Sequence, residues 1–208
     1  MHNADFSVEK GSLTAFIGPN GGGKSTLIKL MSGFFKPDHG SIAVNDGAAI
    51  GYVAEGFGFD DSFPITVKEI VLTGTLQKKI KVFQKYSKTQ HETAEQAIEK
   101  VGLKGFESRG VSQLSGGQQK RVVIARALAS EADILVLDEP DSNLDTEAMK
   151  ELYALLKELK KSKTIIVASH NIDFILDTAD SAVYINKNIK SYEDPSELKA
   201  KLKEGMII

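Results

Sequence analysis

The sequence contains no cysteine, and its apolar runs are short. Without cysteine the chain can form neither a disulfide framework nor a thiolate metal site, a composition that fits a cytoplasmic protein. The longest dense apolar stretches, "ILVL" and "IIVA", fall far below the roughly 18 to 20 residues that cross a bilayer. The opening "MHNADFSVEK" also lacks the basic and apolar regions of a secretion signal. We therefore expect no direct membrane insertion, and any work at a membrane needs a partner that spans it.

Clusters of positive charge are also missing. The 26 Lys and Arg residues are mixed along the chain with 28 Asp and Glu residues, which gives a net charge of −2. Affinity for nucleic-acid phosphates comes mainly from clustered basic side chains, so the composition argues against a general nucleic-acid binder. The 208 residues are enough for one domain with a sizeable core.

Short apolar runs predict the strands of an α/β fold. They lie at 12–18, 41–45, 49–54, 133–138, 164–169 and 181–186. The runs "ILVL" and "TIIVA" are continuous rather than alternating, as in parallel strands that helices cover on both faces. Amphipathic patterns predict helices at 93–103 and 146–161, the second with Asp145 as its N-cap.

Residues from about 59 to 125 contain no good strand pattern. We interpret them as a mostly helical subdomain inserted into the α/β core, within a single domain over residues 1–208. The stretch "KKIKVFQKYSK" (78–88) is basic and amphipathic. A solvated helix face is the favoured interpretation, ahead of a contact with a membrane surface or a partner.

The stretch "GPNGGGKST" matches the phosphate-binding pattern G-x-x-x-x-G-K-[ST], between an apolar strand and a helix. Glycines let successive backbone N–H groups turn toward phosphate oxygens, and the helix presents its positive end there. The lysine places a cation against the β- and γ-phosphates, and the following serine offers a hydroxyl to Mg²⁺. The residues expected to bind the nucleotide are Gly18, Pro19, Asn20, Gly21, Gly22, Gly23, Lys24, Ser25 and Thr26.

An acidic pair ends the strand pattern "ILVLDEP". Ligands of parallel sheets lie beyond the carboxyl ends of the strands. Asp138 is therefore expected near the Mg²⁺ shell, and Glu139 near the water that attacks the γ-phosphate, which it would orient or deprotonate. The alternative is turn chemistry, because Asp-Glu-Pro also terminates strands. The phosphate loop on the same sheet favours the functional interpretation.

Five motifs in order resemble the ATPase domains of ABC transporters: "GPNGGGKST", "LSGGQQKR", "ILVLDEP", "DSNLD" and the histidine of "VASH". The likeness runs from about residue 4 to about residue 187. It implies a P-loop NTPase core, with a mainly parallel sheet flanked by helices and an inserted helical subdomain. It also implies ATP and Mg²⁺ as cofactors and an ATPase activity coupled to transport.

The resemblance gives "LSGGQ" a role in a second molecule. In this family two copies pack head to tail, and the phosphate loop of one copy and the LSGGQ of the other close on the same ATP. Ser115, Gly116, Gly117 and Gln118 would thus bind the partner's nucleotide, with the following helix pointing its N-terminus at the γ-phosphate. The alternative is a helix N-terminus without a ligand.

Two further roles follow from the resemblance. His170 corresponds to the switch histidine, which contacts the γ-phosphate and the attacking water; a capping or core histidine is the alternative. Residues 142–145, "SNLD", correspond to the loop that crosses the dimer interface. Asp145 can cap the next helix at the same time.

The sequence departs from the family in two places. A glutamine usually follows the strand "IGYVA" and reaches Mg²⁺; here that position is Glu55, and no glutamine occurs in residues 1–76. A carboxylate can bind Mg²⁺, but it adds negative charge near a polyanion. The family also has an earlier strand with an aromatic residue that stacks on adenine, and this sequence begins after it. His2 is a poor substitute by position, and Phe6 alternates with apolar neighbours as a core residue does. We therefore expect weak nucleotide affinity unless an upstream segment exists.

The segment 63–74 and the stretch before "LSGGQQKR" resemble the branch that takes up manganese, zinc or iron, and related branches for haem or siderophores share much of it. The resemblance implies a homodimer or a pair with another ABC ATPase, bound to an integral membrane permease at the inner face of the cell membrane. A soluble ABC ATPase acting on nucleic acid or ribosomes would carry coiled-coil insertions or tandem cassettes, and this sequence has neither. A regulatory module with little turnover remains the other alternative.

Overall fold

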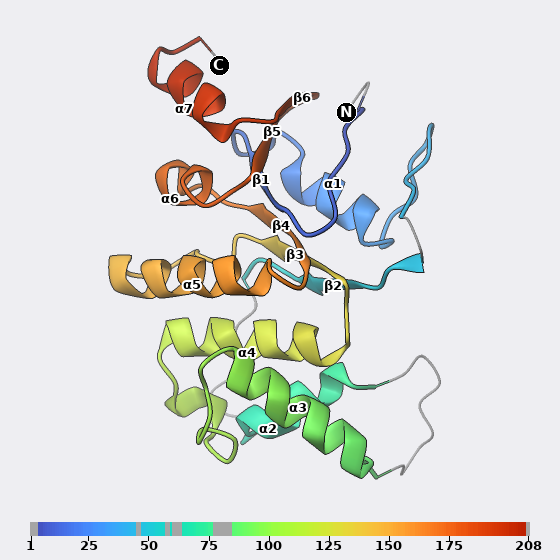
Figure 1. Cartoon of the computed structure of the whole chain (residues 1–208), viewed down its shortest axis with the longest axis vertical. Coiled ribbons are helices and arrows are strands. Elements are labelled where there is room, and N and C mark those ends of the chain that lie inside the picture. The colour runs from blue at the N-terminus through green and yellow to red at the C-terminus, as the bar shows by residue number, and fades with distance from the viewer. Residues whose placement is uncertain (1–3, 45–46, 57–58, 60–63, 77–84, 207–208) are drawn as a thin grey trace.

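The computed structural model describes residues 4–44, 47–56, 59, 64–76 and 85–206 (Figure 1). The strands are β1 (Leu13–Ile17), β2 (Ile50–Val53), β3 (Ile134–Asp138), β4 (Thr164–Ala168), β5 (Ser181–Asn186) and β6 (Asn188–Tyr192). The α-helices are α1 (Lys24–Met31), α2 (Val67–Gly74), α3 (Lys88–Lys100), α4 (Gly116–Ala129), α5 (Thr146–Leu159), α6 (Ile172–Leu176) and α7 (Pro195–Lys203).

The six strands form one sheet in the order β2-β3-β4-β1-β5-β6. The first five are parallel, and β6 pairs antiparallel with β5. The carboxyl ends of β1, β2, β3 and β4 therefore meet at one edge. The phosphate loop, Glu55 and His170 follow β1, β2 and β4, and the acidic pair lies at the end of β3. The sheet thus gathers residues from four distant parts of the chain.

The strands predicted from continuous apolar runs are buried on both faces. Every residue of β1 and β4 is buried, and so are the last four residues of β3. Leu135 and Leu137 face one apolar cluster, and Val136 faces the other, together with Phe16 and Ile28. The prediction of a mainly parallel α/β sheet covered on both faces is confirmed.

Helices α2, α3 and α4 pack together at one end of the molecule, away from β5, β6 and α7 (Figure 1). Each begins at a capping box, in which a hydroxyl residue and the residue three places on exchange hydrogen bonds, with Thr66, Ser87 and Ser115 as N-caps. Because Ser87 caps α3, this helix starts before the predicted residue 93. Of the predicted basic stretch 78–88, residues 78–84 lie outside the described part of the chain.

One predicted strand was wrong, and one observed strand was not predicted. Residues 41–44, which the structure describes, form no strand, and Asn45 lies outside the described residues. Ile42 and Val44 alternate as strand residues do but are 43% and 38% exposed, without a neighbouring strand to pair with. Strand β6 was not predicted, because its polar sequence "NIKSY" becomes extended through pairing with β5.

In the described part of the chain, no helix is long and apolar enough to cross a membrane.

Candidate nucleotide-binding site

The phosphate loop joins β1 to α1, as the sequence predicts. A Cβ atom at Gly18 would lie 2.0 Å from the carbonyl oxygen of Ile185, and one at Gly22 would lie 2.6 Å from the same atom. Only glycine fits at these two positions. The N-cap of α1, Gly23, has no side chain to bond the first amides, and the first turn of this fully described helix holds no acidic residue. The helix N-terminus is therefore suited to an anion.

Lys24 is folded back over this loop. Its Nζ donates to the carbonyl oxygens of Gly18 at 2.9 Å and Pro19 at 3.1 Å, and the residue is only 5% exposed. Burial lowers the pKa of Lys24, although the nearby carboxylates of Glu139 and Asp138 oppose this shift. Because the ammonium group already lies against the loop, phosphate oxygens can replace the two carbonyl oxygens as its hydrogen-bond acceptors.

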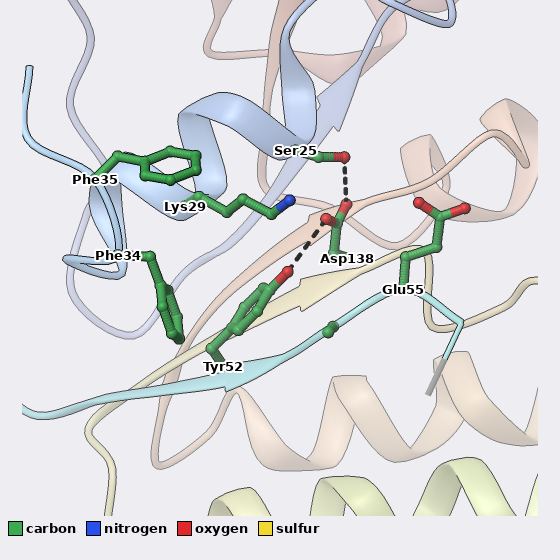
Figure 2. Close-up of a pocket in the computed structure, with 8 residues that line it drawn as sticks. Ser25, Lys29, Phe34, Phe35, Tyr52, Glu55 and Asp138 are labelled. Atoms are coloured by element: carbon green, nitrogen blue, oxygen red, sulfur yellow. Dashed lines mark hydrogen bonds between the residues drawn. The ribbon is translucent and has the colours of Figure 1, made fainter. Parts of the chain in front are cut away.

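Oxygen-bearing side chains gather in a pocket of about 440 Å³ beside the loop (Figure 2). The Ser25 hydroxyl lies 3.3 Å from Asp138 Oδ1, and the Tyr52 hydroxyl lies 3.5 Å from Asp138 Oδ2. Glu55 lines the same pocket. Hydroxyl and carboxylate oxygens are the donors that Mg²⁺ prefers, usually with substrate phosphates completing its shell. Among the described residues, no three His, Cys, Asp or Glu side chains lie together as a metal-binding group.

The negative charge of Asp138 is unfavourable in this pocket because the side chain is buried. The residue is 2% exposed, and burial raises its pKa, while the hydrogen bond from Ser25 opposes the shift and the charge of Glu55 adds to it. A pKa above that of the unfolded chain means that ionisation destabilises the native state as the pH rises through this range.

We expect Asp138→Asn to raise the melting temperature of the nucleotide-free protein at pH 8. The expected gain is on the order of 1 kcal/mol, or about 2–4 °C, because a neutral amide avoids the cost of a buried charge. The gain should shrink as the pH falls toward the native pKa of Asp138, where the wild-type carboxyl is protonated. Thermal unfolding from pH 8 to pH 5, followed by circular dichroism, measures this. A gain that grows toward low pH would contradict the assignment.

Glu139 and His170 meet at the ends of β3 and β4. Glu139 Oε1 lies 2.6 Å from His170 Nε2, and the two side chains are 16% and 42% exposed. Glu139 has a positive φ of 49°, a sparsely populated conformation for this residue type, and its backbone N–H donates to Ala168 at 2.9 Å. Burial raises the pKa of Glu139, while His170 opposes the shift. The carboxylate is therefore a better proton acceptor than an exposed one.

The "LSGGQ" residues form the N-terminus of α4. Ser115 Oγ accepts from the Gln118 amide at 3.3 Å, and Gln118 Oε1 accepts from the Ser115 amide at 3.1 Å. The capping alternative is thus present in the structure, and it leaves open what else the helix end binds. A Cβ at Gly116 would meet nothing within 4 Å, whereas one at Gly117 would lie 3.2 Å from the Ala148 Cβ. Figure 1 places α4 in the helical group, apart from α1.

The remaining predicted positions have simple placements. Asp145 caps α5, with Oδ1 accepting from the Ala148 amide at 2.8 Å. Phe6 packs edge-on against the buried Phe16, with ring centroids 5.6 Å apart, so the core-facing prediction is confirmed. His2 lies outside the described residues.

Sequence reasoning missed several residues next to the site. Tyr52 reaches Asp138 from the neighbouring strand, and Lys120 donates from α4 to the Ser142 hydroxyl at 3.2 Å. Asp141 is 3% exposed and hydrogen-bonded to residues around His170. Its position two residues after Glu139 was the available signal, but "DEPD" reads equally well as a polar turn.

Comparison with known proteins agrees with this geometry. The chain is 40% identical to the zinc uptake system ATP-binding protein ZurA of Listeria innocua, covering 91% of this chain and 77% of that protein. It is 33% identical to the manganese transport system ATP-binding protein MntA of Synechocystis, covering 91% and 76%.

Solved structures give the same result. A metal-chelate type ABC transporter in an inward-facing conformation superimposes with a TM-score of 0.83 at 33% identity, covering 92% of this chain and 75% of that chain. The dimeric bacterial ABC transporter cassette MJ0796 superimposes with a TM-score of 0.73 at 26% identity, covering 89% and 86%.

Two family models match the sequence. One, described as an AAA domain, matches residues 109–177. The other, described as ABC transporter, matches residues 1–142, well over half of the chain. With the phosphate loop, the acidic pair and the strand-end histidine in one site, the chain belongs to the ABC transporter family, as an ATP-binding domain that hydrolyses ATP.

Proposed function

We propose that this chain is the ATPase subunit of a metal-ion uptake transporter, working as a head-to-tail pair bound to a separate membrane permease. The observation that carries the proposal is the contact of Glu139 with His170 at the sheet edge that also bears Lys24. The zinc and manganese systems among its relatives support the metal class. The absence of a spanning helix from the described residues is in keeping with a peripheral subunit at the cytoplasmic face of the membrane.

The roles that we propose combine this geometry with the motifs that the chain shares with its family. Residues 18–26 hold the phosphates through backbone amides, and Lys24 turns its ammonium group from the loop carbonyls to the β- and γ-phosphates. Ser25 and Asp138, with Glu55 beside them, would hold Mg²⁺, which neutralises charge that develops on the phosphoryl group. The set of oxygen donors fits this ion.

We assign the hydrolytic roles to Glu139 and His170. Glu139 orients the attacking water and accepts its proton, and its raised pKa suits that task. We assign contact with the γ-phosphate to His170, which pairs with Glu139 at 2.6 Å and is 42% exposed. Ser115, Gly116, Gly117 and Gln118, at the N-terminus of α4, bind the partner's nucleotide.

Purification of the tagged chain from gently solubilised membranes tests the proposal. We expect a multispan permease to co-purify, and ATP turnover of the complex to exceed that of the Glu139→Gln variant. Metal uptake by cells should depend on the same chain. Isolation without any multispan protein, together with turnover no higher than that of Glu139→Gln, would instead support a regulatory nucleotide-binding module.

Glu55 is the residue that favours the second function, a regulatory module with little ATP turnover. It lines the pocket with Ser25 and Asp138, and its charge adds to the rise in pKa that burial causes at Asp138 and Glu139. A negative charge here opposes the approach of a polyanion. We propose that Glu55 keeps contact with the metal but slows hydrolysis or weakens its coupling.

Glu55→Gln is therefore expected to alter ATP hydrolysis. Removing this exposed charge should tighten Mg-ATP binding by about fivefold and raise turnover at saturating Mg²⁺ and ATP. Turnover measured against both Mg²⁺ and ATP concentration checks this. Identical rates and metal dependence in the two proteins would dispose of the idea.

A further inference from the structure

A buried carboxylate lies next to the hydrolytic pair but outside the roles described above. Asp141 is 3% exposed, and its Oδ2 accepts three side-chain hydrogen bonds. The donors are Tyr153 Oη at 2.9 Å, Ser169 Oγ at 2.7 Å and Asn171 Nδ2 at 2.6 Å. Burying a carboxylate costs free energy unless hydrogen bonds compensate for the lost water. The three bonds to Asp141 supply this compensation.

The bonds join the two loops that carry Glu139 and His170. Asp141 lies two residues after Glu139, and its partners Ser169 and Asn171 lie directly before and after His170. The Asn171 backbone amide also donates to Ser169 Oγ at 2.9 Å, which closes the turn around the histidine. A single carboxylate oxygen thus fixes the separation of the two strand-end loops.

Helix α5 contributes Tyr153 to this network. The Tyr153 hydroxyl donates to Asp141 and lies 3.1 Å from Ser169 Oγ, and its ring stacks on Phe174 with the ring centroids 5.9 Å apart. Burial and the charge of Asp141 raise the pKa of the Tyr153 hydroxyl, so it keeps its proton and stays a donor. Catalytic groups must be held within fractions of an ångström, and networks of this kind supply that precision.

We propose that Asp141 is a positioning residue, which sets the contact between Glu139 and His170 by bonding Ser169 and Asn171 on either side of the histidine. The inference rests on the roles proposed for Glu139 and His170. It concerns the rate of hydrolysis rather than nucleotide affinity, because the phosphate loop lies on another strand end and shares no bond with this network in the described residues.

The test compares Asp141→Ala, Asn171→Asp and the double variant Asp141→Asn/Asn171→Asp. Asp141→Ala should lower kcat per bound nucleotide at least about tenfold and leave KM within about threefold, because loose loops misplace the pair without touching the phosphates. Asn171→Asp places two carboxylates together and should lower kcat similarly. The double variant exchanges the amide and the carboxylate and should restore kcat to within about fivefold of wild type.

Two controls separate positioning from stability and from the assigned roles. Leu159→Ala removes a buried apolar group from the same helix and should lower the melting temperature while kcat per bound nucleotide stays unchanged. Glu139→Gln tests the roles on which the inference rests; if that variant hydrolyses ATP normally, those roles fail first. Two outcomes would overturn the positioning role alone, provided that Glu139→Gln is inactive. The first is wild-type kcat in Asp141→Ala. The second is a double variant whose kcat is no higher than that of Asn171→Asp.

Discussion

Replacing Glu139 by Gln is expected to lower ATP turnover per bound nucleotide by about 10²–10⁴-fold. Glutamine keeps the shape and the hydrogen bond toward His170, 2.6 Å away in the native pair, but its amide cannot accept the proton of the attacking water. Affinity for Mg-ATP should stay within a few fold, because the phosphate loop and Lys24 are untouched. Single-turnover hydrolysis and equilibrium binding measure the two quantities separately.

Glu158→Gln is the matched control for this variant. Glu158 lies on the exposed face of α5 and pairs only with Lys161 in the described part of the chain, at 2.7 Å. Its replacement should leave turnover unchanged. Wild-type turnover in Glu139→Gln, or a loss explained wholly by weaker Mg-ATP binding, would remove Glu139 from the hydrolytic role.

A second large effect is expected from Gly116→Glu. A Cβ atom at Gly116 would meet nothing within 4 Å, and the residue lies in the first turn of α4, so the fold should persist. An acidic residue at a helix N-terminus is even favourable to the helix. If this end of α4 faces the γ-phosphate of the partner's ATP, the new charge opposes that phosphate, and turnover should fall by about 100-fold or more.

Gly116→Ala controls for the loss of glycine alone. Alanine fits the same open space and favours the helix, so turnover should remain near wild type. Melting temperatures of all three proteins establish that the fold is kept. Wild-type turnover in Gly116→Glu would mean that α4 begins away from any nucleotide, and that its capping box serves the helix alone.

The part of the site that lies in contiguous motifs was predictable from sequence. The phosphate loop and its lysine depend on local backbone geometry and on a strand followed by a helix, which nine residues specify. Asp138 and Glu139 were predictable for the same reason, because a continuous apolar run ends at them. These features need no knowledge of which strands become neighbours.

Residues that depend on strand register were not predictable. Tyr52 reaches Asp138 only because β2 pairs with β3, with Tyr52 opposite Val136. The bonds of Asp141 require β3 and β4 to be adjacent and α5 to bring Tyr153 under both loops. Likewise, Ile42 and Val44 have the alternation of a strand, but alternation cannot supply the neighbouring edge that a strand needs.

The central claim is that each hydrolytic site is built from two molecules, and mixing two inactive variants tests it directly. Lys24→Ala disables the phosphate loop, and Gly116→Glu disables the helix end offered to the partner, so each variant alone should be inactive. An equimolar mixture that exchanges freely forms mixed dimers in half of its pairs. Each mixed dimer combines one intact phosphate loop with one intact helix end, so the mixture should recover about a quarter of wild-type turnover. A mixture that stays as inactive as its components would contradict the shared site.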